Sequence, residues 1–295
     1  MRITIIANPV AGGGKGRVRG EALRDALVAR GHEAELLITT GPGDAVGMAA
    51  GAQGDCVVGV GGDGTVNEVL NGLRDPAQRL AALPVGTANV VARELRIPKR
   101  PEALAELIDR GASRTIDTGL CNGRRFLQSA GSGFDAAVVR EVHAGRGKRL
   151  SYAGYAGPII RTLRTYTFPK IAVHADGRLV CADAQYALVG NCVNSAGLFP
   201  LTPEAALDSG RLDLVAFRDL TLFRMARIAA ASFRAGFAER PDVLYLQCSE
   251  ATFAPAGAEP VYLQIDGDPA GELPASIRVA ARSLRMVAPD PTPAK

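Results

Sequence analysis

The pattern of apolar and polar positions along the chain changes near residue 120. Before it, short apolar runs alternate with stretches whose apolar side chains recur every three or four residues, which predicts strands followed by helices. This alternation is typical of a parallel sheet with helices on both faces and ligand sites at the carboxyl ends of its strands. The predicted strands are 2–7, 33–40, 55–60, 80–86 and 113–119, and the predicted helices are 18–29, 44–52, 65–73, 88–95 and 102–110.

After residue 120 the pattern becomes short segments with a period of two, separated by Gly, Asn and Pro, which predicts an antiparallel sandwich or barrel. We therefore expect an N-terminal Rossmann-like three-layer α/β/α domain, residues 1–120, followed by a mainly antiparallel β-sandwich domain, residues 121–295. The C-terminal tail is expected to pack back on the first domain, and residues 289–295 to fray. The predicted β segments are 124–133, 169–176, 177–191, 210–217, 242–253, 260–268 and 275–288, interrupted by helices at 152–163 and 222–237.

Composition narrows the classes of function. With 295 residues, 47% of them hydrophobic, the chain can bury a large core. Its net charge of +4 favours anionic partners such as nucleotide phosphates or a negatively charged bilayer. Aromatic residues make up only 5% and Trp is absent, and no zinc-finger or RNA-recognition signature occurs, so we expect no nucleic acid partner. No signal peptide and no run of about 18 apolar residues is visible, so any membrane contact is expected to be peripheral.

Cysteines and histidines contribute little to the expected chemistry. The five cysteines have no C-x-x-C spacing and are expected to be buried thiols of a reducing cytosol. Only three histidines occur, His32, His143 and His174, far apart in sequence. This argues against a zinc site and a Ser-His-Asp triad, and the turn around Ser132 does not match G-x-S-x-G. Carboxylates and backbone amides are left to act on a substrate.

The segment GVGGDGTVNEV places glycines and one carboxylate between a predicted strand and a predicted helix. Gly61, Gly62 and Gly64 leave no Cβ to block a phosphate approaching the helix N-terminus. Asp63 would repel that phosphate unless a divalent cation lies between them, or unless it accepts a proton from an acceptor hydroxyl. The alternative is that Asp63 only caps the helix. Thr65, with Glu68 three residues later, already matches a capping box, which favours phosphoryl transfer for Asp63.

Two further glycine loops, NPVAGGGKG and PVGTAN, follow the first and fourth predicted strands. Both are expected at the same edge of the sheet as the GGDG turn. Neither is a Walker loop, because Lys15 is followed by Gly16 instead of Ser or Thr. Each loop alone is also explained as an ordinary turn, but three of them at one edge favour a phosphate site.

At this point the chain resembles the diacylglycerol kinase catalytic-domain family, which includes bacterial lipid kinases and sphingosine kinases. The GGDG turn alone also occurs in NAD kinases and phosphofructokinases, but its combination with GTAN and a late DG-acid motif is specific. The matching segments are Asn8 to Gly16, Gly59 to Leu73, Leu83 to Pro98, Ile116 to Gly119, Val189 to Asn191, Pro203 to Val215 and Ile265 to Asp268.

The resemblance implies an ATP-dependent, magnesium-requiring kinase that phosphorylates a lipid hydroxyl between its two domains. The second domain would hold the lipid, and Asp268, where the family usually has Glu, would be a proton acceptor beside Asp63. Asp63 would also meet magnesium through ATP. The residues that the resemblance assigns to ATP are Asn8, Thr39, Gly61, Gly62, Asp63, Gly64, Thr65, Val66, Asn67 and Thr87.

Two departures from the family pattern concern metal binding. Val90 stands where the family has the acid of GTAND, and Ser209 stands where its structural magnesium loop has the second Asp of L-D-D-G. A simple turn is therefore expected at Ser209, and Asp208 is left as the metal candidate there. Asp117 and Glu68 are weaker candidates for a role in the site.

The expected partners are ATP, a lipid substrate and a peripheral membrane surface, with a homodimer left open, and the expected location is the cytoplasm with transient contact at the inner membrane. Basic residues Arg140, Arg146, Lys148, Arg149, Arg161, Arg164 and Lys170, and a stripe of Arg224, Arg227 and Arg234, could dock on anionic lipid. The alternative is a solvated face over an ordinary core helix. A nucleotide-responsive lipid-binding protein without catalysis and an NAD kinase-like phosphotransferase are the alternative functions.

Overall fold

The computed structural model describes residues 1–144, 156–194 and 199–290 and divides the chain into two compact units. Unit 1 contains residues Met1–Asp117 and Arg282–Lys295, and unit 2 contains Thr118–Ala281. The expected boundary after residue 120 lies within the strand β5 (Arg114–Cys121), and the chain from Arg282 onward belongs to unit 1. Three sets of residues from the predictions lie outside the described residues. They are the basic residues Arg146, Lys148 and Arg149, the first part of the predicted helix at 152–163, and most of the tail at 289–295.

Unit 1 is built on a parallel sheet with the strand order β2-β1-β3-β4. The end of β16 extends it, because Arg285 and Met286 pair in parallel with β4. The strands are β1 (Arg2–Ala7), β2 (Glu33–Ile38), β3 (Cys56–Gly61), β4 (Arg79–Pro84) and β16 (Ala275–Met286). The strands β3 and β4 are buried along their whole length, as expected for a parallel sheet covered on both faces.

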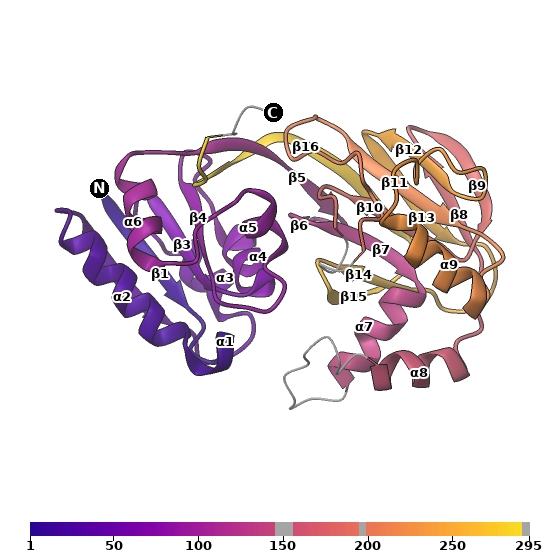
Figure 1. Cartoon of the computed structure of the whole chain (residues 1–295), viewed down its shortest axis with the longest axis horizontal. Helices are drawn as coiled ribbons and strands as arrows, with labels where there is room; N and C mark the ends of the chain where they lie inside the picture. The colour runs from indigo at the N-terminus through magenta and orange to yellow at the C-terminus, as the bar shows by residue number, and fades with distance from the viewer. Residues whose placement is uncertain (145–155, 195–198, 291–295) are drawn as a thin grey trace. The chain divides into compact units, whose positions relative to one another are not determined.

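Helices cover both faces of this sheet, with α2 and α6 on one side and α3, α4 and α5 on the other (Figure 1). They are α1 (Ala11–Gly14), α2 (Gly16–Val28), α3 (Asp44–Ala50), α4 (Asp63–Gly72), α5 (Val90–Glu94) and α6 (Pro101–Asp109). The predicted three-layer α/β/α architecture is confirmed.

Unit 2 contains an antiparallel sheet of six strands in the order β12-β11-β10-β7-β14-β15. A second antiparallel set, β16-β13-β8-β9, packs against it, and side chains of both sets, including Phe253 and Leu214, share one buried core. The predicted β-sandwich is thus confirmed. The strand β5 (Arg114–Cys121) enters unit 2 from unit 1, and β16 returns from unit 2 to unit 1. The strands that lie wholly within unit 2 are β6 (Arg124–Phe126), β7 (Ser129–Gly133), β8 (Ile171–Ala175), β9 (Arg178–Ala184), β10 (Tyr186–Gly190), β11 (Leu212–Phe217), β12 (Leu244–Cys248), β13 (Glu250–Pro255), β14 (Tyr262–Ile265) and β15 (Asp268–Glu272).

Three helices of unit 2 are described: α7 (Phe134–Ala144), α8 (Ala156–Thr165) and α9 (Leu222–Ser232). The period-two pattern did not predict α7, and it joined β6 and β7 into one strand, although these two belong to different sheets. The helix expected to reach Phe237 ends at Ser232, because the chain turns at Phe233 and Phe237 packs into the core.

A hydrogen bond joins the two points at which the chain passes between the units, on strands β5 and β16, which also pair. The Arg282 amide donates to Asp117 Oδ1 over 2.6 Å, and the Asp117 side chain is fully buried. Asp117, a weaker site candidate from the sequence, therefore fastens β5 to the end of β16.

Two expectations from composition can be compared with the structure. All five cysteines are buried free thiols, as predicted. Within the described ranges, none of the helices has the length and apolar character needed to cross a membrane.

Candidate active site

The three glycine loops of unit 1 meet at the carboxyl edge of its sheet. Asn8 of the first loop (residues 8–16) contacts the residues on either side of the glycine turn (residues 61–64): its backbone amide donates to Val60 O over 3.0 Å and its side-chain amide donates to Thr65 Oγ1 over 3.4 Å. The first loop also meets the third loop (residues 84–89), because a Cβ on Gly12 would lie 2.3 Å from the Val85 side chain. The predicted convergence is therefore present within unit 1.

The closest approach is between the glycine turn and the third loop. The amides of Val85 and Gly86 both donate to Gly61 O, over 2.8 and 3.2 Å. A Cβ on Gly86 would lie 2.5 Å from Gly62 Cα, so a side chain at residue 86 would force the two loops apart. Asn89, at φ 46°, holds the third loop by accepting a hydrogen bond from Gly86 N and donating one to Gly86 O. This pair of hydrogen bonds to Gly86 explains the Asn of GTAN in structural terms.

Asp63 is the first residue of α4, and its carboxylate caps a different helix, α5. Its Oδ1 accepts a hydrogen bond from the Val90 amide over 2.8 Å, and Val90 begins α5. Burial raises the pKa of Asp63 above its usual value, and the amides of Val90, Asn89 and Val91 pull the pKa back down. A carboxylate with a raised pKa is a stronger base, so the arrangement suits both a structural and a chemical role.

The capping box predicted for α4 is wrong. The helix begins two residues before Thr65, at Asp63, and no side chain caps it. Glu68 instead accepts hydrogen bonds from the amides of Gly43 and Ala45 at the start of α3. The Asp63 amide bonds to the carboxylate of its own residue, whereas the amides of Gly64 and Thr65 have no helical partner, so they can receive an anion.

Gly64 has no structural need to be glycine. It has ordinary helical torsions, and a Cβ placed on it would meet nothing within 4 Å. Gly61 differs, because a Cβ there would lie 2.3 Å from Thr65 Oγ1. The open space in front of Gly64 leaves room for a phosphate group against the helix N-terminus. The Asp63 carboxylate is a hard oxygen ligand of the kind that binds Mg²⁺ together with phosphate oxygens and water.

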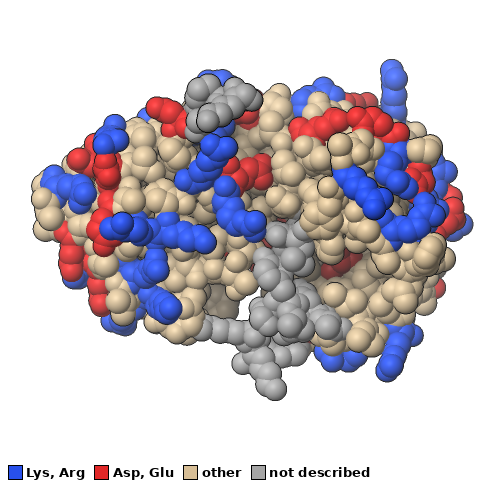
Figure 2. Space-filling view, viewed as in Figure 1, with Lys and Arg blue, Asp and Glu red and all other residues tan. Residues whose placement is uncertain are grey.

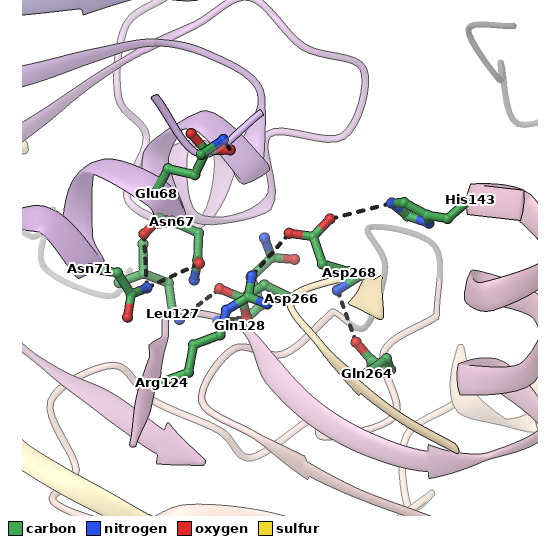
Figure 3. A network of polar contacts seen from close by, with 12 residues as sticks. Asn67, Glu68, Asn71, Arg124, Leu127, Gln128, His143, Gln264, Asp266 and Asp268 are labelled. Carbon is green, nitrogen blue, oxygen red and sulfur yellow. Dashed lines mark hydrogen bonds and ion pairs between the residues drawn. The ribbon is translucent and has the colours of Figure 1, made fainter. Parts of the chain in front are cut away.

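The other residues assigned to ATP divide into two groups. Thr87 is exposed on the third loop, and its hydroxyl can reach a ligand. Thr65 and Asn67 are buried; Thr65 accepts a hydrogen bond from Asn8, and Asn67 accepts one from Asn71 (Figure 3). Val66 packs against Gly59, and the Thr39 hydroxyl bonds to Ala7 O. These four buried side chains shape the edge of the sheet, and their contact with a nucleotide stays a prediction.

In unit 2 the DG motif forms a tight turn between β14 and β15. The buried Asp266 carboxylate accepts hydrogen bonds from three consecutive amides, those of Leu127, Gln128 and Ser129, over 2.8 to 3.0 Å. Gly267, at φ 82°, adopts a left-handed conformation that favours glycine. Asp266 thus anchors the turn, and Asp268 presents its carboxylate from the first position of β15.

The Asp268 carboxylate lies between the side chains of Arg124 and His143. Arg124 Nη2 contacts one oxygen over 3.0 Å, and His143 Nε2 lies 3.5 Å from the other (Figure 3). The Asp268 side chain is 37% exposed, so solvent or a substrate can still reach it. Neither partner was predicted. The small number of histidines had argued against a part for any of them, including His143, in the expected chemistry.

The N-terminal end of α7, the helix that the sequence pattern did not predict, is linked to the same turn. Asp135, in its first turn, accepts a hydrogen bond from Gln264 over 3.3 Å, and Gln264 in turn accepts one from Gly267. Burial raises the pKa of Asp135 to about 6. Residues 134–144 begin with an acid, Asp135, and end near a basic residue, His143. This charge pattern is typical of a helix and could have revealed α7.

Ser209 lies in a turn, as expected, closed by hydrogen bonds between its hydroxyl and both the amide and the carbonyl of Arg211. Asp208 beside it is exposed. Among the residues that the structure describes, no three His, Cys, Asp or Glu side chains lie close enough together to hold a metal ion. Metal binding by Asp208 stays a prediction.

Relatives of this chain carry diacylglycerol kinase names. It is 29% identical over 296 residues to the diacylglycerol kinase of Bacillus subtilis strain 168, and the aligned region covers 98% of this chain and 96% of that protein. It is also 29% identical over 300 residues to the diacylglycerol kinase of Staphylococcus aureus strain RF122 / ET3-1, covering 98% and 93%. The crystal structure of a diacylglycerol kinase from Bacillus anthracis strain Sterne shares the fold, with a TM-score of 0.78, 24% identity and 98% and 97% coverage.

Family models match both parts of the sequence. Residues 2–121 match the diacylglycerol kinase catalytic domain, and residues 128–288 match the YegS C-terminal NAD kinase beta sandwich-like domain. The chain therefore belongs to the diacylglycerol kinase catalytic-domain family, in the branch that carries this C-terminal sandwich.

Proposed function

We propose that this protein is an ATP-dependent lipid kinase that transfers the γ-phosphate to a hydroxyl of a diacylglycerol-like or sphingoid lipid. Membership of a kinase family supports phosphoryl transfer, and the named relatives support a lipid acceptor. The choice of ATP and of the lipid belongs to the proposal.

One observation carries the proposal: the open glycine edge of unit 1. The backbones of Gly62 and Gly86 touch, the N-cap residue of α4 is a glycine without a side chain, and a Cβ added to Gly64 would have no protein atom within 4 Å. Backbone amides without side chains in front of them are the usual means of holding a triphosphate. We assign ATP to this edge, with Thr87 as an exposed hydroxyl beside it.

Mg²⁺ bound with ATP would neutralise charge on the phosphates and orient them. Asp63 is the carboxylate placed to meet it, because it lies at the start of α4 beside the open space at Gly64. The hydrogen bond from Val90 fixes one oxygen of Asp63, which limits how the side chain can rotate. Asp63 would therefore act from one defined position.

We assign proton acceptance from the lipid hydroxyl to Asp268. Asp266 and Gly267 hold it at the tip of a rigid turn, and Arg124 and His143 keep its carboxylate oriented. Asp63 is the alternative base, since its raised pKa also suits this step. A positioned general base is typically worth about 10²–10⁴-fold in rate.

We also propose that the protein works in the cytoplasm and contacts the inner membrane surface only transiently. The net charge of +4 supports attraction to anionic lipid.

The test is a phosphoryl-transfer assay with radiolabelled ATP and purified protein, offered diacylglycerol, a sphingoid base and NAD in separate reactions with and without Mg²⁺. We expect label in one of the lipids and none in NAD, and we expect chelation of Mg²⁺ to abolish transfer. Asp63→Asn serves as the control for contaminating kinases, because it keeps the acceptor for the Val90 amide and removes the charge.

The alternatives have distinct outcomes. Label in NAD alone would favour an NAD kinase-like phosphotransferase, to which the sandwich domain is related by its family description. Measurable ATP binding without transfer to any acceptor would favour a nucleotide-responsive lipid-binding protein. Either result would overturn the lipid kinase proposal.

A further inference from the structure

The helix α9 turns an apolar face away from the core. Its residues Ile228, Ala231 and Ser232 are buried against unit 2. On the opposite side, where a soluble helix normally carries polar residues, Leu222 is 65% exposed and Phe223 is 73% exposed. This arrangement needs an explanation, because scattered single apolar residues are common but a contiguous set marks an interaction surface.

The exposed apolar positions form a continuous stripe. At 3.6 residues per turn, Leu222, Ala226, Ala230 and the C-cap residue Phe233 follow one another along a single side of the helix. Phe233 is 64% exposed, and Phe199 extends the stripe by packing edge-on against it with a centroid distance of 6.0 Å. We call Phe199, Leu222, Phe223, Ala226, Ala230 and Phe233 the α9 face.

One border of the α9 face is cationic. Arg227 is exposed and lies next to Phe223 and Ala230 around the helix. Arg234 is exposed in the turn that follows α9, and residues 222–237 contain no acid. Arg227 lies 3.6 Å from Asp242, an acid outside the helix whose pKa Arg240 lowers by hydrogen bonding. Within the described ranges no ion pair forms at Arg234. Figure 2 shows blue side chains beside a tan surface over the part of unit 2 that contains α9.

We propose that the α9 face docks on an anionic membrane surface, with Leu222, Phe223 and Phe233 entering the acyl region and Arg227 and Arg234 contacting lipid phosphates. An interfacial helix combines an apolar side with such a basic border. A second copy of the chain would instead bring two basic borders against each other, and Asp242 beside the α9 face is already paired with Arg227 and Arg240. The inference deepens the proposed function by naming the docking face.

The test is co-sedimentation of the full chain with vesicles of phosphatidylcholine, with and without phosphatidylglycerol, in the absence of nucleotide. We expect binding to the anionic vesicles. Phe223→Ser with Phe233→Ser should weaken it about tenfold or more, because two large apolar side chains no longer leave water. Arg227→Gln with Arg234→Gln should weaken binding to anionic vesicles by about tenfold and leave binding to neutral vesicles unchanged.

The matched control is Arg178→Gln with Leu179→Ser on β9, which removes one exposed cation and one apolar side chain, 55% exposed, from another part of unit 2. It should bind like the wild type. Unchanged binding of the phenylalanine variant, or no binding of the wild type to anionic vesicles, would overturn the proposal. A wild type that is dimeric without lipid, and becomes monomeric in the phenylalanine variant, would assign the α9 face to a second copy instead.

A second measurement keeps the test independent of the serine variants. The chain has no Trp, so Phe223→Trp introduces a single reporter. Its fluorescence should shift to the blue on adding anionic vesicles, whereas Leu179→Trp should show no shift. The absence of a shift at residue 223 would contradict insertion. Because no nucleotide is present, docking and phosphoryl transfer can fail separately.

Discussion

The two carboxylates proposed for catalysis are held in opposite ways. Asp63 in unit 1 is held by backbone amides at the start of a helix, and burial raises its pKa. Asp268 in unit 2 is partly exposed and is held by the ends of two long side chains, Arg124 and His143. A main-chain amide fixes one oxygen of the buried Asp63, whereas side chains orient the carboxylate of Asp268 and leave it partly exposed. The difference suits Asp63 to the phosphate end and Asp268 to the hydroxyl of the lipid.

Asp63→Asn and Asp63→Ala separate charge from capping at this residue. We expect both to lower turnover by about 10²–10⁴-fold, since both remove the carboxylate. Only Asp63→Ala should also lose about 1 kcal/mol of stability, because it leaves the Val90 amide at the start of α5 without its acceptor. Turnover and thermal unfolding check this. If Asp63→Asn turns over like the wild type, capping is the whole role of Asp63.

Asp268→Asn should lower turnover by about 10²-fold while the fold and ATP affinity remain unchanged. Asp268→Glu should recover most of the activity, because Glu is the residue that the family pattern has at this position. Arg124→Gln should cost less than Asp268→Asn, since His143 still contacts the carboxylate. Steady-state kinetics with a short-chain lipid measure all three. Equal activity of Asp268→Asn and the wild type would leave Asp63 as the base.

Gly64→Ala should change stability and binding in opposite directions. Alanine inside a helix is about 1 kcal/mol more favourable than glycine, and a Cβ at residue 64 meets no protein atom within 4 Å. The same methyl would occupy the space assigned to a phosphate, so ATP affinity should fall about tenfold or more. Calorimetric titration and thermal unfolding measure the two effects. Gly47→Ala in α3, also free of contacts, should stabilise the protein without affecting ATP.

Asp135 should make stability depend on pH. Its pKa of about 6 in the folded protein lies above the ordinary value of 3.8, so the folded state holds the proton more tightly than the unfolded state. Stability is therefore expected to fall as the pH rises from about 4 to about 6. Asp135→Asn removes this ionisation, so its melting temperature should fall less over that window than that of the wild type. A parallel fall in both proteins would show that Asp135 titrates normally.

Local sequence patterns predicted unit 1 well, because buried parallel strands and glycine turns depend on neighbouring residues. They failed where a side chain serves a distant segment. Glu68 matched a capping box for its own helix, yet it caps α3, which lies more than twenty residues earlier in the chain. Asp63 likewise matched an N-terminal position of α4 but caps α5. Spacing within one segment cannot distinguish these partners.

In unit 2 the sequence pattern indicated the sandwich, and the family resemblance proposed Asp268 as a site residue, but neither indicated the surroundings of Asp268. The reason is that His143 and Asp268 are far apart in sequence and are brought together by α7, a helix that the period-two pattern hid. The α9 face was hidden for a different reason. Periodicity shows that a helix is amphipathic, but only packing shows that its apolar residues Leu222 and Phe233 lie on the outside.

The hydrogen bond between Asp117 and Arg282 has a consequence for how such proteins can diversify. Because it joins the two junctions of unit 2, that unit leaves and re-enters the α/β fold at neighbouring points. A domain inserted in this manner behaves as a cassette, since exchanging it requires only two cuts and leaves the host strands in their order. Replacing residues 118–281 would thus change the second unit and leave the proposed phosphate-binding loops of unit 1 unaltered.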